Sequence, residues 1–168
     1  ELVKWDYELR TPGQIVDVVA RASEVAMAPP RGPVYLSLPR EPLAAAMPEP
    51  PAPTKPRPHA AAAFPDPKAI ATLAEWLATA ERPLIIASTL PNDAVPVLSH
   101  LAERCAIPVI THNPRTVCLP SSHPMHFGYE PGTLLADADL VIVLEADVPW
   151  TPQLQGPSAG VRVAHIGE

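Results

Sequence analysis

The sequence has few cysteines and no long hydrophobic run, and both absences restrict what the protein can be. Its 168 residues include only Cys105 and Cys118, too few for a disulfide framework, so a reducing, cytoplasmic setting is expected. Cys105 falls on the apolar face of an expected helix and is predicted to be buried. No apolar stretch approaches the roughly 18 residues of a membrane span, so we expect a soluble chain.

Basic residues are also scarce. Twelve Lys and Arg stand against 18 Asp and Glu, for a net charge of −6, and no basic cluster is present. Neither a nucleic acid nor a membrane is therefore expected as a partner. The first residues contain no basic region followed by an apolar core, so no targeting segment is expected. The chain begins at Glu1 rather than at methionine, which suggests a fragment.

Proline, by contrast, is abundant, and its distribution divides the chain. There are 25 prolines, about 15% of the sequence against a usual share of roughly 5%, and ten of them lie between Pro39 and Pro67. We therefore expect three parts. Residues 1–43 form the last helix and strand of one α/β domain, residues 44–65 a Pro- and Ala-rich linker, and residues 66–168 a second domain, incomplete at its C-terminal end.

The first part has the pattern of an amphipathic helix followed by a strand. Thr11, Pro12 and Gln14 predict a helix start, with Gln14 completing a capping box. Apolar side chains then recur at spacings of three and four and predict one buried face, made by Ile15, Val18, Val19, Ala22 and Ala26. Residues 33–39 read as a short strand closed at each end by proline. One helix and one strand cannot make a core, so this part belongs to a larger domain.

The second part alternates helices and apolar strands. Asp66 and Pro67 begin a helix that runs to about residue 80, and Asn92 or Asp93 begins another that runs to residue 105. Strands are expected at residues 84–87, 108–111, 140–144 and 161–166, with a short helical piece at 133–136. Strands that are apolar on both faces favour an α/β fold, a Rossmann-like parallel sheet flanked by helices. The inward faces of the two longer helices are expected to comprise Ile70, Leu73, Ala74 and Leu77, and Val97, Leu98, Leu101, Ala102 and Cys105.

Ligands of such sheets bind beyond the carboxyl ends of the strands, so polar residues there are the candidate binding residues. These are Ser88, Thr89, Asn113, Glu145 and Asp147. The first turn after a strand, residues 88–93, has no glycine and carries a carboxylate. A dinucleotide needs close backbone approach at this turn, so the usual phosphate cradle is not predicted.

No catalytic residue and no metal site are predicted. Glu145 and Asp147 alternate along the strand end and could act as acid and base. A solvated strand end that accepts backbone hydrogen bonds is favoured, because no nucleophile, activating base or glycine-rich loop accompanies the pair. His112, Cys118, His123 and His126 share one loop region without the paired spacing of a zinc site. Trp150 is expected to be a packing anchor.

Several segments together resemble a known enzyme family. Residues 29–41, PPRGPVYLSLPRE, are similar to the end of the pyrimidine-binding domain of thiamine-diphosphate-dependent enzymes of the acetolactate synthase type. The segments that follow are similar, in order and spacing, to the central domain of that superfamily: RPLIIA at 82–87, LAE at 101–103, IPV at 107–109, HP at 123–124 and ADLVIVL at 138–144.

The resemblance implies a parent enzyme of three α/β domains that forms a homodimer or homotetramer, with thiamine diphosphate and Mg²⁺ held between domains of two subunits. The catalytic glutamate and the Gly-Asp-Gly metal motif of the family belong to regions outside this sequence. Some relatives hold FAD in the central domain with glycine-rich turns. The departure at residues 88–92 argues against FAD here.

The leading hypothesis is thus a fragment of a thiamine-diphosphate-dependent 2-oxo-acid decarboxylase or acyl-transferring enzyme, inert by itself, whose central domain is structural. Two alternatives stay open. One is an independent nucleotide- or small-molecule-binding module that uses the five crevice residues, and the other is a purely oligomer-forming role.

Overall fold

The chain folds into two compact units, each with its own parallel sheet. The computed structural model describes residues 2–28, 30–46 and 64–167, and the units are Glu1–Phe64 and Pro65–Glu168. Most of the expected linker, residues 44–65, lies outside the described residues. Every helix in the described ranges is too short or too polar to cross a membrane.

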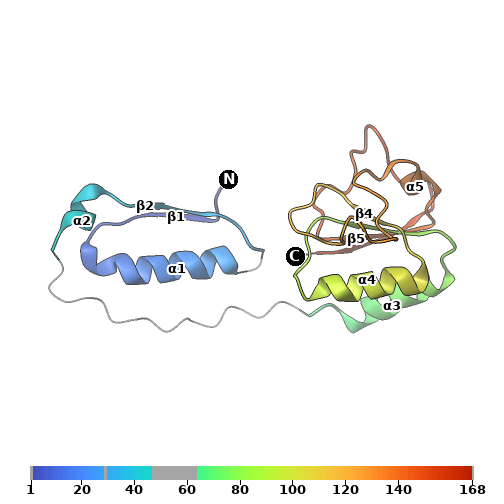
Figure 1. Ribbon diagram of the computed structural model, residues 1–168, viewed down its shortest axis with the longest axis horizontal. Coiled ribbons are helices and arrows are strands. Elements are labelled where there is room, and N and C mark those ends of the chain that lie inside the picture. Colours follow the sequence, from blue (N-terminus) through green and yellow to red (C-terminus); the bar gives the residue numbers. More distant parts are fainter. Residues whose placement is uncertain (1, 29, 47–63, 168) are drawn as a thin grey trace. The chain divides into compact units, whose positions relative to one another are not determined.

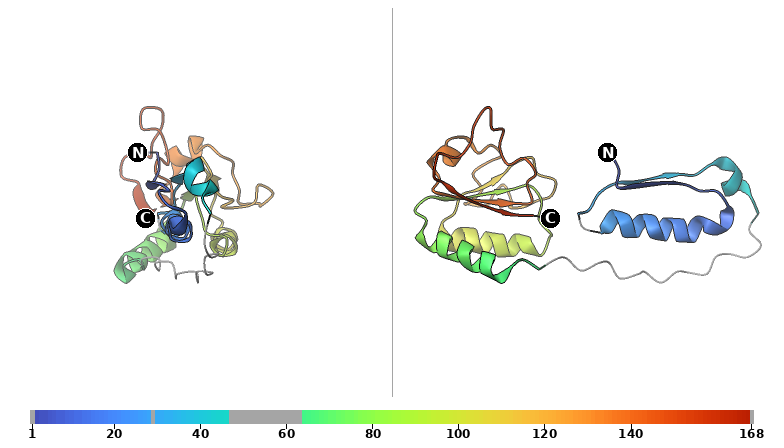
Figure 2. Two further views of the ribbon diagram at one scale, coloured as in Figure 1. Left: turned by 90° about the vertical axis from the view of Figure 1, so that its left-hand side faces the viewer. Right: turned by 180° about the vertical axis from the view of Figure 1, so that it is seen from behind.

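The first unit is a strand–helix–strand arrangement. Strand β1 (Trp5–Glu8) pairs in parallel with β2 (Val34–Ser37), and a 3₁₀ turn η1 (Pro12–Gln14) leads into helix α1 (Ile15–Met27). Figures 1 and 2 show α1 along one face of the strand pair. A short helix α2 (Arg40–Ala44) follows β2. The sequence analysis did not predict β1 or α2.

The start and the buried face of α1 differ from expectation. The expected capping box is wrong, because Thr11 makes no side-chain cap and Gln14 Oε1 is buried without a hydrogen-bond partner. Val18 and Ala22 are buried, whereas Val19 is 48% exposed. A helix that packs on only two strands buries a narrow stripe, and Val19 lies beyond it.

Lys4 fastens the end of α1 to the start of β1. Its Nζ donates to the carbonyl oxygens of Val25 and Ala28, each at 2.8 Å. These are carbonyls at the C-terminal end of the helix, where a cation is favourable. The Lys4 stem passes over Gly32, where an added Cβ would lie 2.8 Å from Lys4 Cδ and 2.9 Å from Cγ. Gly32 therefore leaves room for the lysine.

The second unit is a four-stranded parallel sheet in the order β4-β3-β5-β6. Its strands are β3 (Pro83–Ala87), β4 (Val109–Thr111), β5 (Leu140–Leu144) and β6 (Arg162–Ile166), and its helices are α3 (Pro67–Thr79), α4 (Ala94–Cys105) and α5 (Gly132–Asp137). The central strand β5 pairs with β3 and β6 along its whole length. The predicted fold class, a parallel α/β sheet flanked by helices, is confirmed.

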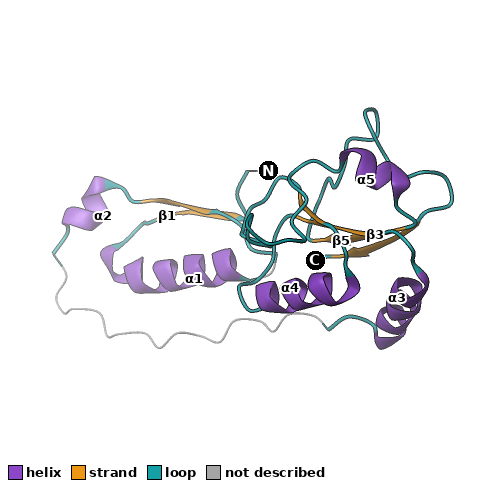
Figure 3. Ribbon diagram, turned by 45° about the vertical axis from the view of Figure 1, so that its right-hand side comes forward, coloured by secondary structure: helices purple, strands orange, loops and turns teal. Residues whose placement is uncertain are grey.

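Alternate side chains of the strands build two cores, one on each face of the sheet. Leu84, Ile86, Val141 and Val143 pack with Leu135 of α5 on one face, where Trp150 is a partly buried packing residue as expected. Ile85 and Ile142 pack with Leu98 and Ala102 of α4 on the other face, beneath partly buried residues of α3. Figure 3 shows the strands between α5 and the α3–α4 pair.

The predicted start of α3 is correct, whereas the predicted buried faces of α3 and α4 are only partly correct. Asp66 caps α3, since its Oδ1 accepts the backbone N–H of Lys68 at 2.9 Å. The predicted buried stripe of α3 is only partly correct, because Leu73 and Leu77 are partly buried while Ile70 and Ala74 are exposed. On α4, Val97 is 68% exposed. Helix α3 has no fully buried residue, and only its partly buried side chains pack against the core.

The prediction that Cys105 is buried is wrong, and the end of α4 explains why. Cys105 is the last residue of α4 and is exposed. The chain reverses at Ala106, which has a left-handed backbone with φ 51°. Ile107 is fully buried and, in place of Cys105, packs in the same core as Ala102.

Strand β4 is flanked on its outer side by a segment that the sequence places in a loop. Val109 donates its N–H to Met125 O at 2.9 Å, and Phe127 donates to Val109 O at 2.9 Å. These two bonds form a parallel bridge between Val109 and His126. Residues 125–127, referred to below as the edge segment, therefore cover the backbone of β4.

Asp139 anchors the turn that enters β3. Its carboxylate accepts the backbone N–H groups of Glu81 at 2.7 Å and Arg82 at 2.9 Å. The hydrogen bond from the Glu81 N–H is the main reason that the pKa of Asp139 is lowered; desolvation opposes this shift, and the hydrogen bond from the Arg82 N–H adds to it. The amino ends of β3 and β5 are thereby tied together.

Replacing Asp139 with Ala should lower the free energy of unfolding by about 1 kcal/mol, the order expected for exposed hydrogen bonds to a carboxylate. Because the folded pKa lies below the unfolded value of about 3.9, the contribution is complete above that pH and is lost as the pH falls through the folded pKa. Urea unfolding at pH 7 and at pH 3 should show the difference shrinking in acid. Asp137→Ala, with an exposed side chain two residues away, should change little; an equal loss there would contradict the assignment.

Gly32→Ala should destabilise the first unit, since the new methyl group displaces Lys4 from the end of α1. We expect a loss of about 1 kcal/mol, similar to Lys4→Met, and a double variant less destabilised than the sum of the two. Gly13→Ala is the control, because nothing lies within 4 Å of its Cβ position. Thermal unfolding followed by circular dichroism measures all four, and additive losses would contradict the shared mechanism.

Candidate functional site

The candidate site lies at the carboxyl edge of the second sheet, between β3 and β5. The chain leaves β3 through α4 to reach β4 on one side, then passes through α5 to β5 on the other. The two connections diverge at this point, which is where open α/β sheets bind ligands. Ser88, His112 and Glu145 are the first residues after β3, β4 and β5, so the edge is lined by polar residues.

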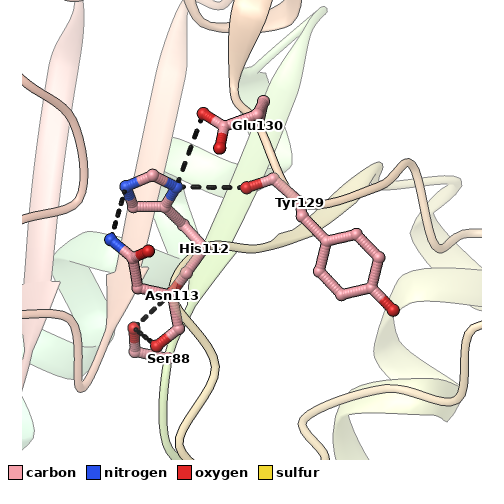
Figure 4. Close-up of polar contacts among 5 residues, drawn as sticks. All are labelled: Ser88, His112, Asn113, Tyr129 and Glu130. Carbon is pink, nitrogen blue, oxygen red and sulfur yellow. Dashed lines mark hydrogen bonds and ion pairs between the residues drawn. The ribbon is translucent and has the colours of Figure 1, made fainter.

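The hydroxyl of Ser88 is already engaged by the protein. Ser88 is 6% exposed, and its Oγ donates to the carbonyl oxygen of His112 in a short hydrogen bond, with Asn113 O at 3.2 Å. Its backbone N–H donates to Leu144 O at 3.1 Å. Figure 4 shows the Ser88 side chain beneath the backbone of His112 and Asn113. Ser88 thus holds the loop after β4 against β3.

Further contacts bring that loop over the end of β3. Arg115 donates its backbone N–H to Ser88 O at 2.8 Å. Thr116 Oγ1 accepts the N–H of Leu90 at 2.8 Å and donates to Leu90 O at 3.1 Å. The Arg115 guanidinium forms an ion pair with Asp147, beyond the end of β5. The loops after β4 and β5 are therefore joined in front of β3.

His112 ties the beginning of the long loop to its end. Its ring is held by Tyr129 O, 3.1 Å from Nδ1, and by the Asn113 amide nitrogen, 3.1 Å from Nε2. Both contacts are satisfied by a neutral ring that donates from Nδ1 and accepts at Nε2. The Glu130 carboxylate lies 3.9 Å from Nδ1, as Figure 4 shows. This buried histidine therefore connects the start of the loop to residues 129 and 130 at its end.

The five residues predicted from the sequence lie at this edge but do not converge on one point. Ser88 contacts the backbone of Asn113, and Asp147 contacts Arg115. Asn113 and Glu145 have left-handed backbones, with φ 45° and 47°. Within the described ranges no hydrogen bond or ion pair joins Glu145 to Asp147. Thr89 Oγ1 is buried without a partner.

The sequence pattern does not predict the roles of Arg115 and Thr116, the two residues that close the loop. Arg115 pairs with a residue 32 positions away and Thr116 with one 26 positions away. The turn-forming Asn-Pro before Arg115 was the one local signal that this stretch returns to the sheet.

The histidines of the loop make hydrogen bonds to other side chains. His123 contacts Ser99 and Glu103 of α4, and His126 contacts Thr111. Cys118 is buried, which raises the pKa of its thiol against the opposing effect of its contact with Thr116. In the described part of the chain, no group of three or more His, Cys, Asp or Glu side chains is placed to hold a metal ion.

The edge does not fit a dinucleotide phosphate. The turn after β3 is free of glycine, the Ser88 hydroxyl is committed to the chain, and the Arg115 guanidinium is paired with a carboxylate. A phosphate would have to displace the loop and its ion pair before it reached backbone N–H groups at the end of β3. The residues present close the crevice themselves.

The second unit is thus an α/β domain whose parallel sheet is covered on both faces and whose carboxyl edge is closed by its own loops. Residues 70–167 match the family described as thiamine pyrophosphate enzyme, central domain, and the chain belongs to that family. The suspected kinship with thiamine-diphosphate-dependent enzymes is thereby confirmed.

Similar proteins span both decarboxylases and synthases. The chain is 32% identical over 147 residues to a probable 2-ketoarginine decarboxylase of Pseudomonas aeruginosa, covering 84% of this chain and 26% of that protein. It is 34% identical over 127 residues to 2-succinyl-5-enolpyruvyl-6-hydroxy-3-cyclohexene-1-carboxylate synthase of Chlorobaculum tepidum, covering 63% of this chain and 22% of that protein.

A solved structure extends the likeness to both units. The thiamine diphosphate-dependent 4-hydroxybenzoylformate decarboxylase of Rhodococcus jostii RHA1 superposes with a TM-score of 0.71 at 27% identity, covering 99% of this chain and 34% of that one. The chain spans about a quarter of the length of the curated relatives and a third of this structure.

Thr116→Val should destabilise the second unit by about 1 to 2 kcal/mol, because it removes both hydrogen bonds to Leu90. Thr89→Val is the matched control, since it removes a buried hydroxyl that has no partner and should be neutral or stabilising. Urea unfolding of the two variants tests this. A loss in Thr89→Val as large as that in Thr116→Val would show that the hydroxyl of Thr89 is bonded.

Proposed function

We propose that this chain is part of a thiamine-diphosphate-dependent enzyme that decarboxylates a 2-oxo acid or transfers the resulting acyl unit, as acetolactate synthases do. The observation that carries the proposal is the family match over residues 70–167. The relatives named above are a decarboxylase and a synthase, which supports this pair of reactions. Within the parent, the second unit is the central domain.

In this proposal, residues 1–43 are the end of the pyrimidine-binding domain, 44–65 a linker and 66–168 the central domain. The first unit supports a larger domain, because two parallel strands and one helix make a small core. Tyr35 is 62% exposed and Leu43 is 55% exposed. Parallel strands are normally covered on both faces and accompanied by further strands, so we infer that the rest of that sheet comes from elsewhere in the parent.

The central domain is structural rather than catalytic in this proposal. Its crevice is closed by Ser88, Arg115 and Thr116, and its carboxylates at residues 145 and 147 make no contact with each other in the described ranges. A catalytic acid or base must lie within hydrogen-bond reach of the group with which it exchanges a proton. Its contribution is to carry and orient the neighbouring domains.

Thiamine diphosphate and Mg²⁺ would be held by residues outside this chain. Bound thiamine diphosphate supplies the ylid and the electron sink for decarboxylation of a 2-oxo acid. The described residues contain no metal-binding cluster, and the chain lacks the family's Gly-Asp-Gly motif. We further propose that the parent is a cytoplasmic homodimer or homotetramer.

The alternative function is a nucleotide- or small-molecule-binding module in its own right. Two observations favour it: the position of Thr89, whose hydroxyl has no partner, and the exposed guanidinium of Arg115 at the switch point of the sheet. Under this alternative a ligand would break the pair between Arg115 and Asp147.

Titration calorimetry of the chain against FAD, ADP and thiamine diphosphate separates the two functions. The structural role predicts no binding of any of the three up to about millimolar concentration, because the crevice is closed and the thiamine site lies in other domains. Micromolar affinity for FAD or ADP would overturn the structural role. Thr89→Val then distinguishes a ligand in the crevice, whose affinity should fall, from one bound elsewhere, whose affinity should not change.

A further inference from the structure

The edge segment, residues 125–127, is positioned by a histidine whose hydrogen bonds depend on its protonation state. His123 lies in the turn before the segment, and its side chain is 9% exposed. Its Nδ1 accepts the backbone N–H of Met125 at 3.1 Å. An amide N–H is always a donor, so Nδ1 must be the unprotonated nitrogen of the ring.

The other nitrogen of the ring fastens the turn to α4. Nε2 lies 2.7 Å from Ser99 Oγ and 3.1 Å from Glu103 Oε1. With Nδ1 unprotonated, Nε2 carries the single ring hydrogen and donates it to Ser99 Oγ, and the Glu103 carboxylate lies beside this bond. Neutral His123 therefore joins α4, the turn and Met125 with every ring nitrogen satisfied.

Met125 is also the residue that pairs with β4. Its carbonyl accepts the N–H of Val109, which is fully buried, and Phe127 returns the second bond to Val109. Protonation of His123 puts a hydrogen on Nδ1, where it faces the N–H of Met125. The hydrogen bond from Met125 to Nδ1 is then lost. Two N–H donors, Nδ1–H of His123 and the backbone N–H of Met125, then face each other at the residue that pairs with β4.

We propose that the edge segment is an acid-sensitive device, in which protonation of His123 loosens its pairing with β4. Histidine is the side chain suited to respond between about pH 8 and pH 5. Opening of the segment would expose the backbone N–H and carbonyl of Val109 in β4. The proposal concerns the central domain itself and does not depend on the parent enzyme's reaction.

Glu103 is the charged group that opposes this effect. It lies on α4, within 4.0 Å of the ring, and would attract an imidazolium. Its side chain is 55% exposed, so the attraction is screened by solvent. His126 faces Thr111 and the ring of Tyr129. In the described ranges no other ion pair to the His123 ring is formed.

Hydrogen exchange of the full chain at pH 7.5 and pH 5.5 tests the proposal. After correction for the intrinsic pH dependence of exchange, the amides of Met125 and Phe127 should exchange about five- to tenfold faster at pH 5.5, the effect of losing one hydrogen bond. The amide of Val143, in the central strand, is the internal reference and should change less than about twofold on the same scale. Equal protection of Met125 and Phe127 at both pH values would overturn the proposal.

Variants assign the effect to this ring. His123→Asn places an amide oxygen near the position of Nδ1, which still accepts from Met125 but does not titrate, so protection should persist at pH 5.5. His100→Asn, on the exposed side of α4, should keep the wild-type pH dependence. Glu103→Gln removes the opposing charge and should enlarge the acid effect, which provides a second measurement if His123→Asn folds poorly. An unchanged pH dependence in His123→Asn would refute the assignment.

Discussion

The second unit depends on one constraint, the burial of β5 on both faces. Five aliphatic residues in succession, Leu140–Leu144, leave no face that can meet water, so helices must cover both sides of the sheet. Pairing with β3 and β6 along the whole strand then satisfies its backbone. Asp139, the residue before this strand, ties the start of the strand to the turn that enters β3. The polar carboxyl edge follows from the same arrangement, since all four strands point the same way.

The sequence predicted the features that arise locally. An apolar strand bracketed by carboxylates, a helix capped by Asp66 and a proline-bounded strand at β2 are each specified by neighbouring residues, and each is present. Strand β1 was missed because Trp5, Asp6, Tyr7 and Glu8 alternate over only four residues, too short a pattern to predict a strand without its partner.

The features that the sequence did not predict depend on contacts between distant residues. Whether Val19 or Cys105 is buried is decided by how much of a helix meets the sheet, and this is a property of the packed unit. The candidate site shows the same limit. Its residues could be placed at the carboxyl edge, but the closure by Arg115 joins positions separated by 32 residues, and the turn-forming Asn-Pro before Arg115 does not specify Asp147 as the partner.

The closed edge has a consequence for how this domain can vary. A bound cofactor would require glycines at the turn after β3 and a fixed loop length around it, because its phosphates need close backbone approach. Here the end of β3 is covered by side-chain and backbone contacts from residues 112–116. Because no phosphate has to approach it, the turn after β3 does not need glycine. Its sequence has only to be compatible with the folded structure. Replacements at this turn are instead constrained by the hydrogen bonds that Ser88 and Leu90 make with residues 112–116.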